Sequence, residues 1–315
     1  MNLYGLPTGY LMCDKPFKLS RVANLWATTV FWSVAVSCVL FALFPETRTI
    51  EELVSMFLPI LRGRYWFFTA YFVVMLISPV LNLVIRSLTK NQFRLFLAVL
   101  FLIFGVIPVA SLRYDVMRIS TGHHFSWMIV LYLIGGYIRT NAPILKAPAR
   151  KYLAGYFLFA AIHLLYKLGT AMVGLQSFSD LLLTYPSPLV VGEAICLFLY
   201  FKNAFSGVPK SSVPGKLICF AAPGVYSVYV IHVHPKIYWN TEIIDLFRAW
   251  DNWNTVAVCA AIISTAAALF VVCICLDSLR QWLFRNMGID QLIDKISARI
   301  EQRMRILADK TEKLR

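Results

Sequence analysis

The sequence predicts an all-α integral membrane protein, a multi-span helical bundle with about eight complete spans plus an N-terminal half-span. Of its 315 residues, 59% are hydrophobic and only 15% are charged, and the mean hydropathy is +0.68. Soluble globular domains carry roughly 45–50% apolar and about 25% charged residues. One soluble core of this size cannot bury such an excess, so soluble enzymes, disordered proteins, coiled coils and secreted disulfide scaffolds are excluded.

Long apolar stretches give the positions of the spans. A membrane-spanning helix needs about 20 mostly apolar residues. The candidate stretches are 23–44, 65–85, 94–112, 125–138, 152–175, 181–201, 217–238 and 255–276. The stretch 125–138 is short and spans only with help from its flanks or from a thin local bilayer. The stretch 181–201 is apolar throughout only from Pro188.

Residues 2–12 predict the inner half of one more span. They are largely apolar and lead directly into a basic loop. As a helix they cover about 16 Å, roughly half of a 30 Å hydrocarbon core. We expect either that the N-terminus begins inside the bilayer or that the chain lacks its beginning.

Basic residues predict the orientation of the spans. The chain carries 30 Lys and Arg against 16 Asp and Glu, a formal charge of +14. Most of the basic residues fall in alternate loops and after the last span, which are therefore expected to be cytoplasmic. In a multi-span protein this excess reports loop orientation, so no nucleic-acid partner is expected. The sequence predicts a multi-pass protein of the cell membrane with a cytoplasmic C-terminus.

The chain divides into a membrane domain, 1–285, and a cytoplasmic basic amphipathic tail, 286–315. Apolar residues recur in the tail at helical spacing from Ile289 to Leu307, with Arg and Lys between them. Such a helix suits the anionic inner leaflet, which makes membrane lipids its expected partner. The alternative is a helix that binds a partner protein. The sequence leaves the oligomeric state open.

Three ionisable residues inside the predicted spans need an explanation. His163 and Lys167 are four residues apart and share a helix face. Glu193 lies in the next span, at a comparable depth to Lys167 if that span starts near Leu181. Two interpretations stay open, an ion pair between Lys167 and Glu193 or a polar substrate cavity. His163 is either a proton acceptor or a core histidine.

A second set of polar residues gathers at the predicted outer ends of the spans. Its members are Arg62, Arg64, His123, His124, His232 and His234. Neutral imidazoles beside arginines suit a site for hydroxyl or anionic groups, because histidine can accept a proton near neutral pH. The alternative is an interfacial belt of aromatic and basic side chains. No P-loop, GxGxxG, HExxH or GxSxG motif is present, and no metal site is expected.

Four segments resemble the acyltransferase-3 family of integral membrane O-acyltransferases. They are Gly9-Tyr10-Leu11 with Lys15, Lys18 and Arg21; Tyr65 to Tyr71 continuing to Ser78-Pro79-Val-Leu-Asn82; Phe125-Ser-Trp127 with Leu131 to Arg139; and Tyr226 to Pro235. Their order and spacing are similar to the family from residue 2 to about 285. No single motif is specific to the family, and the resemblance depends on finding all four in the same order.

The resemblance implies a transferase that moves an acyl group, most simply acetyl from acetyl-CoA, to a hydroxyl of a cell-surface polysaccharide or a lipid-linked sugar. It implies no bound cofactor, since acyl-CoA is the donor substrate. Lys18 and Arg21 would meet the anionic CoA. Arg62, Arg64, Lys167, Glu193 and His234 are expected to line the substrate site.

The family's first span carries an arginine and an essential histidine, and no residue here matches either. The sequence is therefore expected to be truncated at its N-terminus relative to the family, with its activity in question. Transfer to a sugar hydroxyl needs a base and stabilisation of the oxyanion. His232, His124 and His163 are the candidate catalytic residues, if they reach the same cavity.

Two readings from other functional classes remain. A transporter or flippase for a polar lipid-linked sugar would use His163, Lys167 and Glu193 as a pathway, although the halves of the chain show no repeat of the kind common in transporters. A non-catalytic membrane subunit of a glycan assembly complex would not need the first span.

Overall fold

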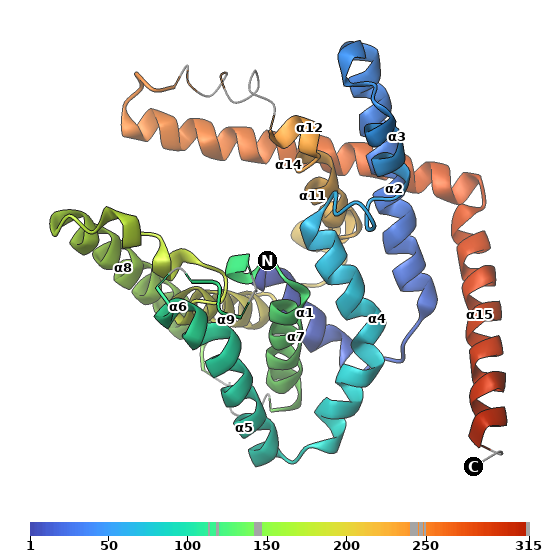
Figure 1. Cartoon of the computed structure of the whole chain (residues 1–315), viewed down its shortest axis with the longest axis horizontal. Coiled ribbons are helices and arrows are strands. Elements are labelled where there is room, and N and C mark those ends of the chain that lie inside the picture. Colours follow the sequence, from blue (N-terminus) through green and yellow to red (C-terminus); the bar gives the residue numbers. More distant parts are fainter. Residues whose placement is uncertain are drawn as a thin grey trace. The chain divides into compact units, whose positions relative to one another are not determined.

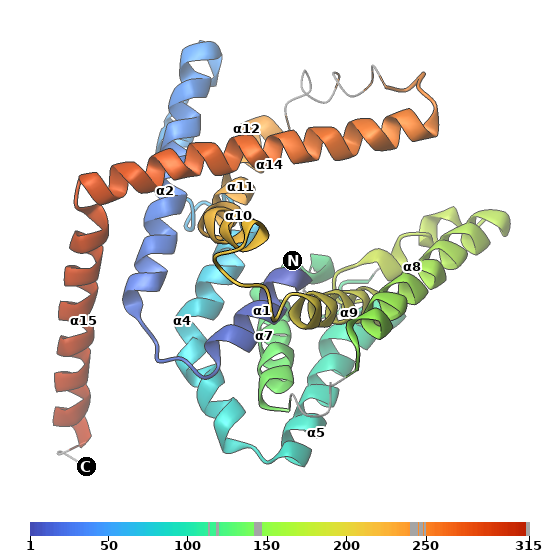
Figure 2. The same ribbon diagram turned by 180° about the vertical axis from the view of Figure 1, so that it is seen from behind.

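The computed structural model describes residues 1–112, 114–117, 120–141, 147–239, 245, 248 and 250–312. These residues form helices and no strands, as Figures 1 and 2 show from opposite sides. Contacts divide the chain into two units, each built from two stretches of sequence. Unit 1 comprises Met1–Phe17 and Trp66–Val208, and unit 2 comprises Lys18–Tyr65 and Pro209–Arg315.

The predicted multi-span helical architecture is confirmed. Within the described residues, 7 helical segments are long and apolar enough to cross a membrane. They are Leu19–Leu43, Trp66–Ser87, Lys90–Ala110, Ala149–Met172, Gln176–Ala204, Val213–His232 and Thr255–Asn286. The eighth predicted span is the shorter apolar helix Phe125–Thr140, and the predicted half-span is the helix α1, Asn2–Met12.

Two helices in unit 1 depart from the predicted boundaries. α9 (Pro188–Ala204) starts at Pro188 and not near Leu181. The residues before it form only the short turns η5 (Gln176–Phe178) and η6 (Leu181–Leu183). A proline fits the first turn of a helix and disfavours helix in the residue before it, so Pro186 and Pro188 together fix the start of α9.

The predicted span 94–112 begins earlier, with α5 (Lys90–Phe101). A capping box formed by Thr89 and Gln92 starts this helix. The span continues through a π-helical turn, η2 (Leu102–Val106), into α6 (Ile107–Ala110). Pro108 stands just after the wide turn, and its missing N–H is consistent with the interrupted α-helical pattern there.

Unit 1 is organised by the close packing of α1 on α7 (Phe125–Thr140). Glycines allow this approach: a Cβ on Gly9 would lie 1.9 Å from the carbonyl oxygen of Tyr132, and one on Gly135 would lie 2.1 Å from that of Leu6. Small residues at a helix interface are typical of packing in membranes. Trp127 on α7, fully buried, donates from Nε1 to Oδ1 of Asn2 at 3.1 Å.

The other helices of unit 1 attach to this pair. α4 (Trp66–Ser87) packs on α7, and the Tyr132 hydroxyl donates to Oδ1 of Asn82 on α4 at 2.7 Å. The Asn82 side chain in turn donates to the carbonyl oxygen of Met12 at 3.1 Å. α9 packs on α1, and α8 (Ala149–Met172) packs on α9. Asn82 thus joins α1, α4 and α7 through hydrogen bonds.

Unit 2 is built on α2 (Leu19–Leu43), against which α11 (Val225–His232) packs, with α14 (Thr255–Asn286) against α11. The hydroxyls of Thr29 on α2 and Tyr226 on α11 are 2.6 Å apart. α11 is preceded by α10 (Val213–Ala221) and a turn at η7 (Ala222–Gly224), where Pro223 interrupts the span. Figure 2 shows α10 and α11 in sequence.

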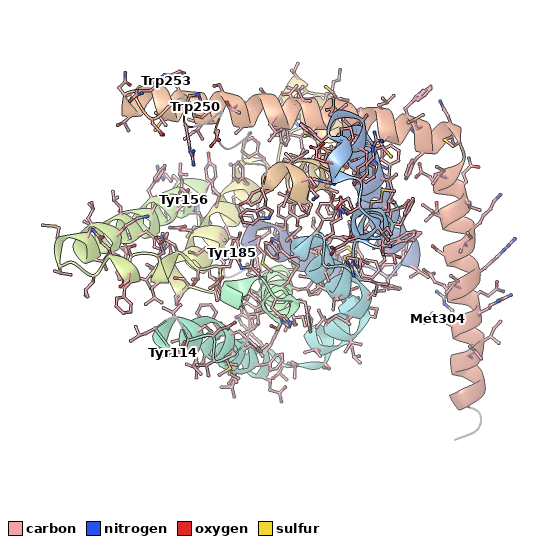
Figure 3. The ribbon with its side chains drawn as sticks, turned by 45° about the horizontal axis from the view of Figure 1, so that its top comes forward. Tyr114, Tyr156, Tyr185, Trp250, Trp253 and Met304 are labelled. Atoms are coloured by element: carbon pink, nitrogen blue, oxygen red, sulfur yellow. The ribbon has the colours of Figure 1, made fainter. Side chains whose placement is uncertain are left out.

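The tail forms the helix α15 (Ile289–Glu312), as predicted. It follows Gly288, whose φ of +69° lets the chain turn after α14. α15 packs along α2, and Glu301 Oε1 accepts the backbone N–H of Leu19 at 2.5 Å, capping the first turn of α2. Leu292, Ile296 and Met304 stay exposed on α15, where Figure 3 labels Met304. Contact of this apolar side with lipid stays a prediction.

Candidate functional site

A buried cluster of polar side chains lies at the far end of α2 in unit 2. We call it the Arg64 cluster; its members are Ser37, Glu52, Arg64 and His234. One nitrogen of Arg64, Nη2, lies 2.5 Å from Glu52 Oε1, 2.5 Å from His234 Nε2 and 2.9 Å from Ser37 Oγ. Ser37 comes from α2, Glu52 from α3 (Ile50–Phe57), and His234 from the start of α12 (Pro235–Tyr238). Three separate elements therefore meet at one guanidinium.

His234 supports Arg64 as a hydrogen-bond acceptor. Its side chain is fully buried, and burial, followed by the positive charges of Arg64 and Lys236, lowers the pKa of His234 to about 3. The imidazole is therefore neutral near pH 7. Since a guanidinium can only donate, Nε2 of His234 presents its lone pair to Arg64. That lone pair is already engaged, so His234 positions Arg64 and is a poor candidate for a general base.

Two neighbours of the cluster differ in their environment. Tyr65 is fully buried, and its burial raises the pKa of the phenol although Arg64 beside it acts in the opposite direction. Arg62 lies at the surface and pairs with Glu51 at 2.8 Å. Of the two predicted arginines, only Arg64 thus joins the buried cluster.

His232 stands near the end of α11 with one nitrogen already fixed. Its Nδ1 donates to the carbonyl oxygen of Val228, one turn back in the same helix, at 2.5 Å. A carbonyl oxygen only accepts, so the hydrogen of the neutral ring is on Nδ1, and Nε2 keeps its lone pair. Of the two candidate histidines of unit 2, His232 is therefore the one that keeps a ring nitrogen able to accept a proton.

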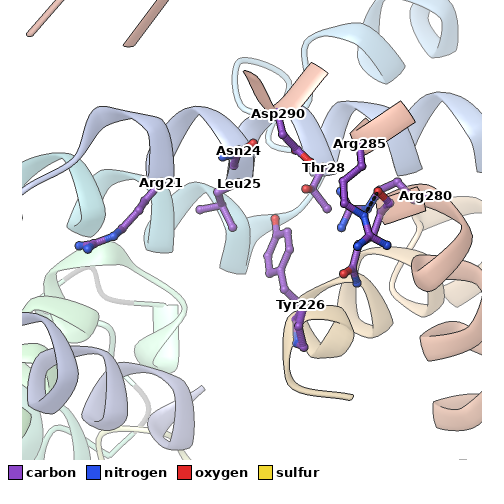
Figure 4. Close-up of a pocket in the computed structure, with 10 residues that line it drawn as sticks. Arg21, Asn24, Leu25, Thr28, Tyr226, Arg280, Arg285 and Asp290 are labelled. Carbon is purple, nitrogen blue, oxygen red and sulfur yellow. Dashed lines mark hydrogen bonds between the residues drawn. The ribbon is translucent and has the colours of Figure 1, made fainter. Parts of the chain in front are cut away.

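A cavity of about 380 Å³ lies between the first turns of α2 and the last turns of α14 in unit 2. The residues that line it are Arg21, Asn24, Leu25, Thr28, Pro223, Tyr226, Arg280, Gln281, Arg285 and Asp290. Figure 4 shows Arg21 and Asn24 on α2 and Tyr226 on α11, with Arg280 and Arg285 on α14. We call it the arginine cavity.

Guanidinium groups are the main charged groups of the arginine cavity. It contains three guanidinium groups, of Arg21, Arg280 and Arg285, and one carboxylate, that of Asp290. Asn24, Thr28 and Gln281 add neutral hydrogen-bonding groups. Guanidinium groups bind phosphate through paired, charge-assisted hydrogen bonds, so this wall suits a phosphorylated ligand. Lys18, predicted with Arg21, is exposed at the start of α2 and does not line the cavity.

Unit 1 contradicts one of the two interpretations of Lys167 and Glu193, the ion pair between them. Glu193 pairs with His163, whose Nδ1 lies 2.7 Å from Glu193 Oε1, and not with Lys167. Lys167 instead lies 3.4 Å from Asp180, and both side chains are largely exposed. The reason is the late start of α9: the turn before it returns along α8, so that Asp180 reaches Lys167 and the depth expected for Glu193 was wrong.

His163 has both ring nitrogens occupied. Nε2 donates to the carbonyl oxygen of Leu182 at 2.7 Å, and Nδ1 faces the Glu193 carboxylate. Both ring nitrogens of His163 are therefore engaged within the protein. Glu193 also lines a separate cavity of about 240 Å³ in unit 1, together with Tyr156, Tyr185 and other residues.

His124 stabilises the start of a helix. It is the N-cap of α7, where its Nδ1 accepts the backbone N–H of Ser126 at 3.3 Å. The side chain is exposed. No group of three or more His, Cys, Asp or Glu in the described part of the chain is placed to hold a metal ion.

Sequence reasoning missed Ser37, Glu52, Asp277, Arg280 and Arg285. The predicted last span ended at residue 276, so Arg280 and Arg285 were counted among the basic residues that follow the spans, whereas α14 continues to Asn286. Glu52 had one available signal, since a buried arginine requires a carboxylate and Glu52 and Glu51 are the two acids nearest to Arg64 in sequence.

Comparison with known proteins decides the family. The family model described as an acyltransferase domain, Acyl_transf_3, matches residues 8–276. The chain belongs to the acyltransferase-3 family. This acyltransferase match includes Arg21, the whole Arg64 cluster and His232, and ends just before Arg280. No curated protein and no solved structure was found to match the chain.

Proposed function

We propose that this acyltransferase takes an acyl group, most simply acetyl, from acyl-CoA bound in the arginine cavity and transfers it to a hydroxyl of a cell-surface glycan or a lipid-linked sugar. The observation that carries this proposal is the set of three guanidinium groups in one cavity of unit 2. The phosphates of CoA are the part of the donor that such a wall recognises. Family membership supports acyl transfer, and the arginines of the cavity support a phosphorylated donor such as acyl-CoA.

The position of the arginine cavity agrees with the orientation proposed from the basic loops. Arg21 stands at the start of α2 and Arg285 at the end of α14, both beside segments rich in Lys and Arg. These ends would be cytoplasmic under the positive-inside rule, where acyl-CoA is available. The protein would then be a multi-pass protein of the cell membrane with its C-terminus inside.

The path from donor to acceptor follows α11. Tyr226 lines the arginine cavity, and His232 is six residues further along the same helix, roughly 9 Å at 1.5 Å per residue. His232 Nε2 would accept the proton of the acceptor hydroxyl. The hydroxyl oxygen attacks the thioester carbonyl, the carbon–sulfur bond breaks, and the proton returns to the CoA thiolate, giving an ester and free CoA. The Arg64 cluster would orient the acceptor near this base.

Transfer is tested with the purified full chain in lipid nanodiscs, radiolabelled acetyl-CoA and a membrane glycan extract. Label is expected in the glycan fraction, and His232→Ala is expected to abolish most of it without lowering the yield of folded protein. Undiminished transfer by His232→Ala would remove His232 from the proposed mechanism.

Donor binding is measured separately, as the Kd for acetyl-CoA by calorimetry. Arg21→Ala and Arg285→Ala are each expected to weaken binding about tenfold or more, since each removes a charge-assisted hydrogen bond. Lys216→Ala is the matched control, because Lys216 is an exposed basic residue in unit 2 that does not line the cavity. Equal affinities for all three variants and the parent would overturn the assignment of the donor site.

A further inference from the structure

A buried carboxylate lies directly behind the arginine cavity. Asp277, on α14, is 0% exposed, and α14 is one of the helices apolar enough to span a membrane. An isolated charge in such a place is costly, so an ionised side chain there must be paired and hydrogen-bonded. Asp277 follows the last residue of the family match, so family membership assigns it no role.

The partners of Asp277 come from three helices. Oδ1 accepts from Trp32 Nε1 on α2 at 3.0 Å and from the hydroxyl of Ser227 on α11. Oδ2 accepts from Gln281 Nε2, one turn along α14, at 2.8 Å. Donors on α2, α11 and α14 therefore hold the carboxylate in place, in addition to its ion pair with Arg280. With all these bonds made, Asp277 has no lone pair left to bind a ligand.

The guanidinium group of Arg280 is held by hydrogen bonds along its edge and by an aromatic ring against its face. Its Nε donates to Asp277 Oδ1 at 2.6 Å and its Nη2 donates to Oδ2 at 3.1 Å, a bidentate pair. The guanidinium carbon also lies 4.9 Å from the ring centroid of Phe284. Nη1 takes part in neither bond to Asp277. The side chain is nearly buried, yet it lines the arginine cavity.

We propose that Asp277 is a positioning residue that holds the guanidinium of Arg280 so that Nη1 faces a phosphate of the acyl donor in the arginine cavity. This proposal rests on the proposed function of that cavity. A free arginine side chain loses rotamer entropy when it binds a ligand. Arg280 has already lost that freedom to Asp277 and Phe284, so its contribution to donor affinity is preorganised.

Substitution of Asp277 should change the affinity only for donors that carry phosphate groups. The Asp277→Asn variant of the full chain, in nanodiscs, is expected to bind acetyl-CoA about tenfold more weakly, the loss of one well-placed charged hydrogen bond. Its affinity for acetyl-pantetheine, a thioester donor without phosphates, should be unchanged. A merely structural role would weaken the two ligands alike, and that result would overturn the proposal.

A double-mutant cycle with Arg280→Lys tests whether Asp277 acts through Arg280. Lysine keeps the charge and cannot form the bidentate pair, so the double variant should bind acetyl-CoA no more weakly than the worse single variant. Additive losses would overturn the proposal. If Asp277→Asn does not yield folded protein, the Trp32→Phe variant tests the proposal in its place. This substitution removes one hydrogen-bond donor to Asp277 and changes no residue that lines the cavity. It should weaken acetyl-CoA binding severalfold, and unchanged affinity would refute the role of Asp277.

The outcomes separate this inference from the proposed function. If Arg21→Ala and Arg285→Ala leave acetyl-CoA affinity unchanged, the donor site itself is wrong and the role of Asp277 falls with it. If those variants weaken binding and Asp277→Asn and Trp32→Phe do not, the donor site stands and only the positioning role is refuted.

Discussion

Acidification should destabilise this protein through one buried histidine. His234 is fully buried, and Arg64 and Lys236 add positive charge around it, so its pKa falls from 6.5 to about 3. Between those two values the unfolded chain binds a proton at this site that the folded chain does not. The free energy of unfolding therefore falls as pH falls below 6.5, and this loss is complete near pH 3.

The size of the effect follows from the slope of about 1.4 kcal/mol per pH unit for one proton. From pH 7 to pH 5 the loss from His234 alone amounts to about 2 kcal/mol, because protonation of the unfolded chain is already partial near 6.5. Ser37 and Arg64 contact the same ring, and Glu52 pairs with Arg64; all three residues are the same in the two proteins compared. For a chain of this size such a loss lowers the melting temperature by several degrees.

The assay compares the parent with His234→Gln by thermal unfolding in detergent at pH 7 and pH 5. Glutamine can accept from Arg64 through its amide oxygen and does not titrate. The parent should lose about 2 kcal/mol more than the variant between the two pH values. An equal loss in both proteins would refute the reasoning, because the acid sensitivity would then belong to other groups.

Two further predictions concern packing and pairing in unit 1. Gly9→Ala should lower the free energy of unfolding by about 1–3 kcal/mol, because its Cβ would lie 1.9 Å from the carbonyl oxygen of Tyr132; Gly169→Ala, which meets nothing within 4 Å, is the control in the same thermal melt and should lose nothing. Lys167→Met should change stability by less than about 1 kcal/mol, since its pair is exposed, whereas Glu193→Leu should cost about 1–3 kcal/mol by leaving a buried histidine nitrogen unpaired. Chemical denaturation of both variants checks the contrast, and an equal cost would contradict it.

The spans were predictable because the bilayer imposes length and composition on a helix. The boundaries were less so. The prediction ended the last span before Asp277, since a charged residue normally marks the water boundary. α14 continues because Arg280 pairs with this carboxylate inside the fold and Trp32, Ser227 and Gln281 donate hydrogen bonds to it. A hydropathy value is assigned to each residue separately, so it does not take into account that another residue pairs with a charge.

The sequence predicted some residues of the candidate site, but it did not predict which of them contact one another. Arg64 and His234 were expected in one outer set, and the structure brings them together. Arg62 is only two residues away and was grouped with them, but it turns to the surface. Glu193 was given the wrong partner because the turn before α9 could not be located from hydrophobic periodicity. These choices depend on tertiary contacts that one sequence does not contain.

The order of the chain has a consequence for biosynthesis. Unit 2 is made from two stretches, Lys18–Tyr65 and Pro209–Arg315, with most of unit 1 translated between them. Ser37, Glu52 and Arg64 are therefore synthesised long before His234, and the interval between Trp32 and Asp277 is longer still. A nascent chain released after Val208 would contain every residue of unit 1 and an unfinished unit 2, with its arginine and indole lacking their later partners. Quality-control proteases that recognise unpaired polar groups in the bilayer would have a clear target in that species, so premature termination should show itself as rapid loss of the protein and not as a stable fragment.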